Sequence, residues 1–236
     1  MTDATAYHPS ARARIKRNPK RAEYDRATIH AILDAAAVCH IAYVIDGQPY
    51  CTPTLHWRDG ERLYWHGSSA SRMLRNQARS LPVCLTVTHL DGLVLARSAF
   101  NHSANFRSAM VFGTAHLVED AEEKRRALED VTDRLFPGRR AELREMTTQE
   151  IKATSVVAMD IEEASAKVRA VNVGDDDEDG HLPVWAGVIP VRQVIGADWP
   201  SPLLPATTPR PAHLAPFAEG RSLDDALLET AGLWRP

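Results

Sequence analysis

The sequence has few cysteines and few aromatic residues. Its 236 residues include three cysteines, Cys39, Cys51 and Cys84, and aromatic side chains make up only 6% of the chain. The cysteines are far apart and no CxxC pair occurs, which argues against a structural zinc site and against a disulfide framework. We therefore expect reduced, mostly buried thiols and no metal centre.

Long apolar runs are also missing. No stretch of about 18 apolar residues occurs that could span a membrane, and the opening residues MTDATAYHPS lack the apolar segment of a signal peptide. The net charge of 28 − 31 = −3 gives no general attraction to nucleic acid. These absences predict a cytoplasmic protein with no membrane or nucleic-acid partner.

Short strands and tight turns dominate what is present. Turn signals at 46–47, 59–60 and 91–92 separate apolar segments, and no GxGxxG follows a strand, which argues against a Rossmann fold. The predicted strands are 40–46, 50–57, 62–66, 82–89, 93–97, 105–118, 154–161 and 167–173. Helical spacing predicts helices after Asp25, at 71–79, after Asp120, at 139–146 and after Thr147. The fold class is therefore mainly β, a six- or seven-stranded antiparallel barrel with peripheral helices.

The two ends of the chain differ in composition from its centre. Residues 1–24 form a basic N-terminal arm, either mobile or wrapped around a partner subunit, and 25–174 form the barrel domain. Residues 175–236 begin with the acidic run 175–179, read as a solvated loop, and continue as an extension that holds most of the 15 prolines. This extension is expected to pack as an irregular edge strand on the barrel or on a partner.

The most informative stretch is LYWHGSSASRMLRN at 63–76. A predicted strand ends at His66, and a small, hydroxyl-rich turn precedes a predicted helix. Free amides at a helix start, serine hydroxyls and an arginine would together bind a phosphate. The residues concerned are Gly67, Ser68, Ser69, Ser71 and Arg72. A serine-capped helix with no ligand explains the same pattern about equally well.

Two further segments carry polar residues in predicted strands. Arg107 and Ser108 interrupt an apolar strand, where a guanidinium would bind a phosphate or the acceptor edge of a flavin if that face lines a groove. Thr52, Pro53 and Thr54 suggest an edge or bulge whose hydroxyls and exposed amides would bond a planar heterocycle. A solvent-facing arginine and a polar edge strand are the alternatives.

Together, LYWHGSSASRMLRN, NFRSAMVFGTAHLVED and IKATSVVAMDI resemble the pyridoxamine 5'-phosphate oxidase-like flavoproteins, most nearly the Nim-type (nitroimidazole reductase-like) subgroup. The resemblance covers about 25–173 and implies an FMN-binding split barrel, built as a homodimer with FMN at the subunit interface. It also implies that the flavin contacts are Thr52, Pro53, Thr54, His66, Gly67, Ser68, Ser69, Ser71, Arg72, Arg107, Ser108 and Trp185, the last from the partner subunit. The C-terminal Arg/His signature of the classical oxidase is not evident.

The resemblance implies an FMN-dependent oxidoreductase that passes electrons from NAD(P)H or another donor to a small planar organic acceptor. His66 is the predicted catalytic residue, since an imidazole exchanges protons near neutral pH. A non-catalytic flavin-binding or redox-sensing module is one alternative. A haem-handling split barrel is another, ranked last because the sequence has no dedicated haem motif.

Overall fold

Alternating apolar residues and tight turns build one antiparallel sheet. The computed structural model describes residues 5–71, 74 and 80–234, and the sheet within them runs β1-β8-β6-β7-β4-β3-β2-β5-β9. Its strands are β1 Ala22–Glu23, β2 Val38–Ile45, β3 Gln48–Asp59, β4 Arg62–Ser68, β5 Leu81–Leu95, β6 Ser103–Leu117, β7 Thr154–Asp160, β8 Glu163–Arg169 and β9 Gly187–Pro190.

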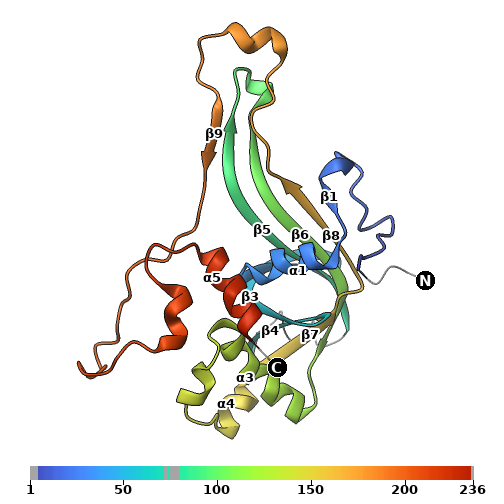
Figure 1. The fold of residues 1–236 in the computed structure, drawn as a ribbon. Coiled ribbons are helices and arrows are strands. Elements are labelled where there is room, and N and C mark those ends of the chain that lie inside the picture. The colour runs from blue at the N-terminus through green and yellow to red at the C-terminus, as the bar shows by residue number, and fades with distance from the viewer. Residues whose placement is uncertain (1–4, 72–73, 75–79, 235–236) are drawn as a thin grey trace.

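A further pairing between β5 and β6 closes the six strands β2 to β7 into a ring. This ring confirms the predicted split barrel with peripheral helices. β5 and β6 continue beyond the ring as a long arm, with β8 pairing along β6 and β9 along β5 (Figure 1). β9 is thus an edge strand, as the proline-interrupted segment predicted.

Gly113 lies where β6 changes partners. β6 pairs with β8 through Phe112 and with β7 from Ala115 onward. A Cβ at Gly113 would lie 2.4 Å from the Asp160 carbonyl oxygen, so only glycine fits here. Gly113 is thus a point of close approach between β6 and the end of β7.

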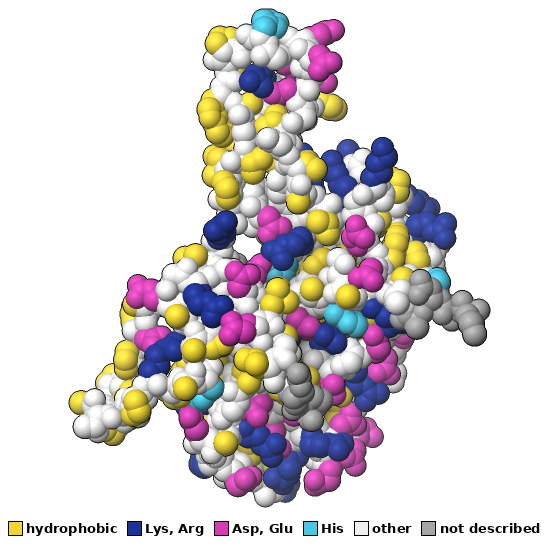
Figure 2. Space-filling view, viewed as in Figure 1, with side chains coloured by type: hydrophobic (Ala, Val, Ile, Leu, Met, Phe, Trp, Pro, Cys, Tyr) yellow, Lys and Arg dark blue, Asp and Glu magenta, His cyan; other side chains and the backbone are white. Residues whose placement is uncertain are grey.

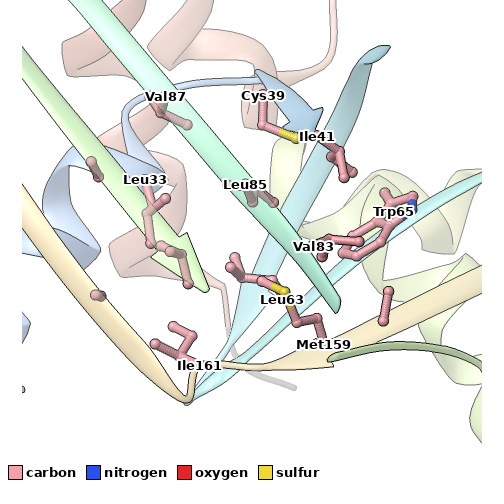
Figure 3. Packing of buried hydrophobic residues seen from close by; sticks show 14 of the residues in the cluster. Leu33, Cys39, Ile41, Leu63, Trp65, Val83, Leu85, Val87, Met159 and Ile161 are labelled. Carbon is pink, nitrogen blue, oxygen red and sulfur yellow. The ribbon is translucent and has the colours of Figure 1, made fainter. Parts of the chain in front are cut away.

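The core fills the ring. Strand alternation points one face of each strand inward, and the buried cluster includes Ile41, Leu63, Trp65, Leu85 and Met159 (Figure 3). Val111 of β6 belongs to the same cluster. α1 adds Ile29, Ile32 and Leu33 to this cluster. A second cluster lies on the outer face, where Trp57 stacks on Tyr64 with ring centroids 5.5 Å apart, beneath Ala127 of α3.

The helices lie outside the ring, as Figure 1 shows. They are α1 Arg26–Asp34, α3 Ala121–Leu135, α4 Thr148–Ala153 and α5 Leu223–Leu233, with short 3-10 turns η1 Pro19–Arg21, η2 Ala99–Asn101, η3 Arg139–Glu142, η4 Asp177–His181 and η5 Ala212–Phe217. The predicted helix N-caps are confirmed, because the side chains of Asp25, Asp120 and Thr147 each accept a hydrogen bond from a backbone amide. No described helix has the length and apolar character that crossing a membrane requires.

The last predicted strand, 167–173, is displaced, because β8 begins at Glu163 and ends at Arg169. Two other local predictions were wrong. Asp91-Gly92 does not end a strand: β5 runs through both residues with a register shift between Leu90 and Gly92. Gly92 is needed there because Val188 and the Ile189 carbonyl lie within 3.2 Å of where its Cβ would be. The predicted helix 139–146 is only the four-residue η3, because its last residues extend toward the cap of α4.

The N-terminal arm packs on its own chain. Tyr7 is buried and donates to Glu61 at 2.6 Å, and Arg12 pairs with Glu163 at 2.6 Å. The described part of this arm therefore contacts the barrel and β8 of its own chain, and the predicted contact with a partner subunit stays a prediction. The acidic run also departs from a fully solvated loop, since Asp175 pairs with Arg97.

Candidate functional site

His66 lies on the outer face of β4, next to the second cluster. Its ring is 5.8 Å from that of Trp57, and it pairs across the sheet with Val156. Its Nδ1 is buried with no partner among the described residues. Burial lowers the pKa of His66, so the imidazole is neutral at neutral pH. A neutral, partly unpartnered imidazole suits accepting a proton or binding a metal better than donating a proton.

The turn after His66 uses its own backbone amides. Ser69 donates to the Ala153 carbonyl at 2.9 Å, Ser71 to the Ser68 carbonyl at 2.8 Å, and Ala70 to the Ser68 hydroxyl at 3.2 Å. The predicted anion site therefore cannot rest on these amides. The hydroxyls of Ser69 and Ser71 have no partner in the described structure, and Gly67 lies close to Leu74. Arg72 lies outside the described residues.

Thr52, Pro53 and Thr54 lie where β3 has an open edge. β4 pairs only with 56–59 of β3, so among the described residues 48–55 pair on the β2 side alone. Pro53 pairs with His40 and is exposed, as expected of a proline beside an unpaired edge. The Thr52 hydroxyl lies 3.1 Å from that of Tyr43.

Arg107 and Ser108 project from opposite faces of β6. Ser108 pairs with Thr88 and Lys167 on the outer face. Arg107 bonds both Asp91 and Asp224, each at 2.7 Å, and these bonds raise its pKa. Its guanidinium is therefore committed to carboxylates of its own chain, whereas the Ser108 hydroxyl donates only a long hydrogen bond, 3.4 Å, to the Lys167 carbonyl.

A groove of about 870 Å³ lies between the α1–β2 connection, the β5–β6 arm and α5. His40, Thr88 and Arg192 line it, together with the Arg107–Asp224 pair. Among these residues sequence reasoning found only Arg107, because the groups lie up to 184 positions apart, from His40 to Asp224, and follow no motif.

His89 completes the cluster in the groove wall. Its Nδ1 is 3.1 Å from Asp224 and its Nε2 is 3.0 Å from the Ile32 carbonyl. Burial alone would lower the pKa of His89, but the hydrogen bonds with Asp224 and Ile32 outweigh burial and raise it. The hydrogen bond from His89 correspondingly lowers the pKa of Asp224. Since both imidazole nitrogens are engaged, this cluster fastens α5 to the barrel.

Trp185 lies on the arm, just before β9, and is 63% exposed. Its ring lies against Gly187, where a Cβ would approach it within 2.8 Å. Gly187 pairs with Leu95 at the outer end of β5, away from the β4 turn. Within one chain, Trp185 and His66 are therefore not brought together, and the predicted contact from a partner subunit stays a prediction.

Comparison with known proteins places these features in a family. The family model for pyridoxamine 5'-phosphate oxidase matches residues 25–168. The chain is 43% identical to the flavocytochrome Anf3 from Azotobacter vinelandii, over 91% of this chain and 100% of that chain, with a TM-score of 0.84. It is 37% identical to the FAD and haem binding protein from Mycobacterium smegmatis, over 86% and 98% of the two chains, with a TM-score of 0.81.

The Nim-type resemblance is more distant. A candidate 5-nitroimidazole antibiotic resistance protein from Bacteroides thetaiotaomicron is 24% identical, over 62% of this chain and 86% of that chain, with a TM-score of 0.48. No curated protein sequence matches the chain. The family model spans more than half of the sequence, and the ring of six strands has the expected fold. The chain belongs to the pyridoxamine 5'-phosphate oxidase family.

Proposed function

We propose that the protein is a flavocytochrome-like redox protein that binds a flavin and haem. The observation that carries this proposal is 43% identity to a flavocytochrome across the whole of that chain, which extends the likeness beyond the barrel. FMN was the cofactor predicted from the sequence. The similarity to an FAD and haem binding protein favours FAD over FMN, and it also favours the haem alternative, which was ranked last in the sequence analysis.

The outer sheet face suits a flavin. The open edge of β3 at 48–55 presents backbone donors and acceptors, and the hydroxyls of Ser69 and Ser71 are available for polar contacts, whereas that of Ser108 donates to the Lys167 carbonyl at 3.4 Å. When bound, a flavin supplies hydride and single-electron chemistry between NAD(P)H or another donor and a small acceptor. The chain would bind and orient it, with Arg72 as the predicted phosphate contact.

Haem needs an axial ligand, and a neutral imidazole is a common one. His66 offers such an imidazole beside Trp57 and Tyr64, with a buried Nδ1 that has no partner in the part of the chain that the structure describes. His40 is a second imidazole, exposed in the large groove. His89 is less suited, because both its ring nitrogens are engaged. We propose His66 as the ligand and His40 as the matched comparison.

The homodimer with flavin at the interface is also part of the proposal. Val38, Val44, Leu55 and Met110 are each at least 43% exposed, and the strand pairings place them on one outer face of β2, β3 and β6. An apolar face of this kind is typical of a subunit interface. Light scattering of the protein and of Met110→Asp tests this: a dimer weakened by the substitution supports it, and a monomeric parent protein contradicts it.

Spectra of the purified protein and of two variants test the cofactors. We expect flavin and Soret bands in the parent protein, loss of the Soret band in His66→Ala, and its retention in His40→Ala. An unchanged Soret band in His66→Ala would overturn the ligand assignment. If His66→Ala keeps its Soret band but loses turnover with NADH or NADPH, the predicted proton-transfer role of His66 is supported. A flavin that no donor reduces would favour the non-catalytic alternative.

A further inference from the structure

Arg169 is a buried guanidinium with no carboxylate partner. It is the last residue of β8 and is only 7% exposed. Its Nη1 donates to the Asn105 side-chain oxygen at 2.5 Å and to the Ala104 carbonyl at 3.5 Å, while its Nε has no partner among the described residues. No described acidic group lies within ion-pair distance. The charge is therefore held by neutral groups alone.

Such an arrangement is unfavourable in the isolated chain. A charge removed from water costs several kcal/mol unless an opposite charge compensates it. Here burial lowers the pKa of Arg169, and the positive charge of Arg21 lowers it further. The chain thus places a second cation, not an anion, beside the buried one. A ligand that carries negative charge would remove this cost.

The surrounding surface is strongly basic. Residues 5–22 contain no Asp or Glu, and we call their cations other than Arg12 the arm cluster: Arg14, Lys16, Arg17, Lys20 and Arg21. Arg12 is paired with Glu163, whereas no ion pair links any arm-cluster residue to a described acidic group. Lys and Arg side chains gather over this arm in Figure 2. The pairing of Ala22 with Lys167 holds the cluster against β8, next to Arg169.

We infer that Arg169 and the arm cluster form a binding site for the phosphate groups of a dinucleotide. A guanidinium with unused N–H groups, flanked by several cations, matches a phosphate better than a single carboxylate. Arg169 and Lys167 lie on the same face of β8, and Lys167 pairs with Ser108. The site is thus continuous with the face proposed for the flavin. The phosphates belong either to the adenylate half of FAD or to NADPH, and naming these sources rests on the proposed function.

Ligand binding to two variants, Arg169→Gln and Arg21→Gln, tests the inference. Arg126→Gln is the control, and Arg169→Lys retains the positive charge. Arg126 is an exposed arginine on α3 with no described ion pair. We expect inorganic pyrophosphate to stabilise the parent protein against heat, but not Arg169→Gln. We also expect one dinucleotide to bind about tenfold more weakly to both Gln variants, the scale of one charge-assisted contact.

Binding measurements with different ligands distinguish FAD from NADPH as the source of the phosphates. If the phosphates are those of FAD, FAD affinity falls while FMN affinity stays unchanged. If they are those of NADPH, NADPH affinity falls while the FAD-to-FMN ratio stays unchanged. Pyrophosphate binding shows the site even if the protein binds no flavin. The inference is overturned if pyrophosphate does not stabilise the parent protein, or if all variants bind every ligand as Arg126→Gln does. A carboxylate supplied by a second copy of the chain would give that negative result.

Discussion

Asp224→Asn is expected to loosen α5 from the barrel. Asp224 accepts a hydrogen bond from Arg107 at 2.7 Å and lies 3.1 Å from His89 Nδ1. Hydrogen bonds to charged groups contribute about 1.5–3 kcal/mol each. The side chains of Asp224 and Arg107 are 22% and 31% exposed, and this exposure weakens their ion pair. In Asp224→Asn, Arg107 still has its ion pair with Asp91. We therefore expect the free energy of unfolding to fall by about 2 kcal/mol at pH 6.

The effect should depend on pH. The folded pKa of His89 is raised above its ordinary value of 6.5, so its contribution is complete below that value and is lost as the pH rises through the folded pKa. The folded pKa of Asp224 is lowered from 3.8, so its contribution is present above that value and is lost as the pH falls through the folded pKa. The deficit of Asp224→Asn should thus be larger at pH 6 than at pH 8.

Urea unfolding of the parent protein and of two variants measures this. Asp198→Asn is the matched control, because the Asp198–Arg210 pair, at 2.6 Å, is about as short as the Asp224–Arg107 pair but lies on the surface, with side chains 54% and 37% exposed. Exposed pairs contribute about 0–1 kcal/mol. The reasoning is refuted if Asp224→Asn costs no more than Asp198→Asn, or if its deficit grows from pH 6 to pH 8.

Two further substitutions test the barrel itself. Gly113→Ala should destabilise the protein by about 2 kcal/mol or more, because its Cβ would overlap the Asp160 carbonyl; an unchanged melting temperature would contradict this. Asp34→Asn should cost about 3 kcal/mol in urea unfolding, because it leaves the buried Arg134 and the partly buried Arg58 without their carboxylate. A cost below 1 kcal/mol in that experiment, typical of an exposed pair, would contradict the second prediction.

The barrel was predictable because its signals are local. Strand alternation and the Asp59-Gly60 turn reach only neighbouring residues, and the caps at Asp120 and Thr147 need three residues each. Asp91-Gly92 was wrongly predicted to be a turn, because the reason for a glycine at this position is distant in the sequence. Gly92 leaves room for β9 to pair with β5, and β9 comes almost 100 residues later.

The candidate site was less accessible to sequence reasoning. His66 and the serine turn stood in one segment, so they could be recognised together. By contrast, Arg107 was expected to face a ligand. No pattern near Arg107 in the sequence predicts that Asp224 is its partner. Arg169 could not be recognised from the sequence either. Its lack of a carboxylate partner becomes visible only once β8 is placed between β6 and the N-terminal arm.

The absorption spectrum of the purified protein, with identification of the released flavin by chromatography, tests the central proposal most directly. We expect a Soret band together with flavin absorption, and FAD as the released flavin. Protein that contains neither chromophore, and that binds neither added FAD nor added haem, would contradict it.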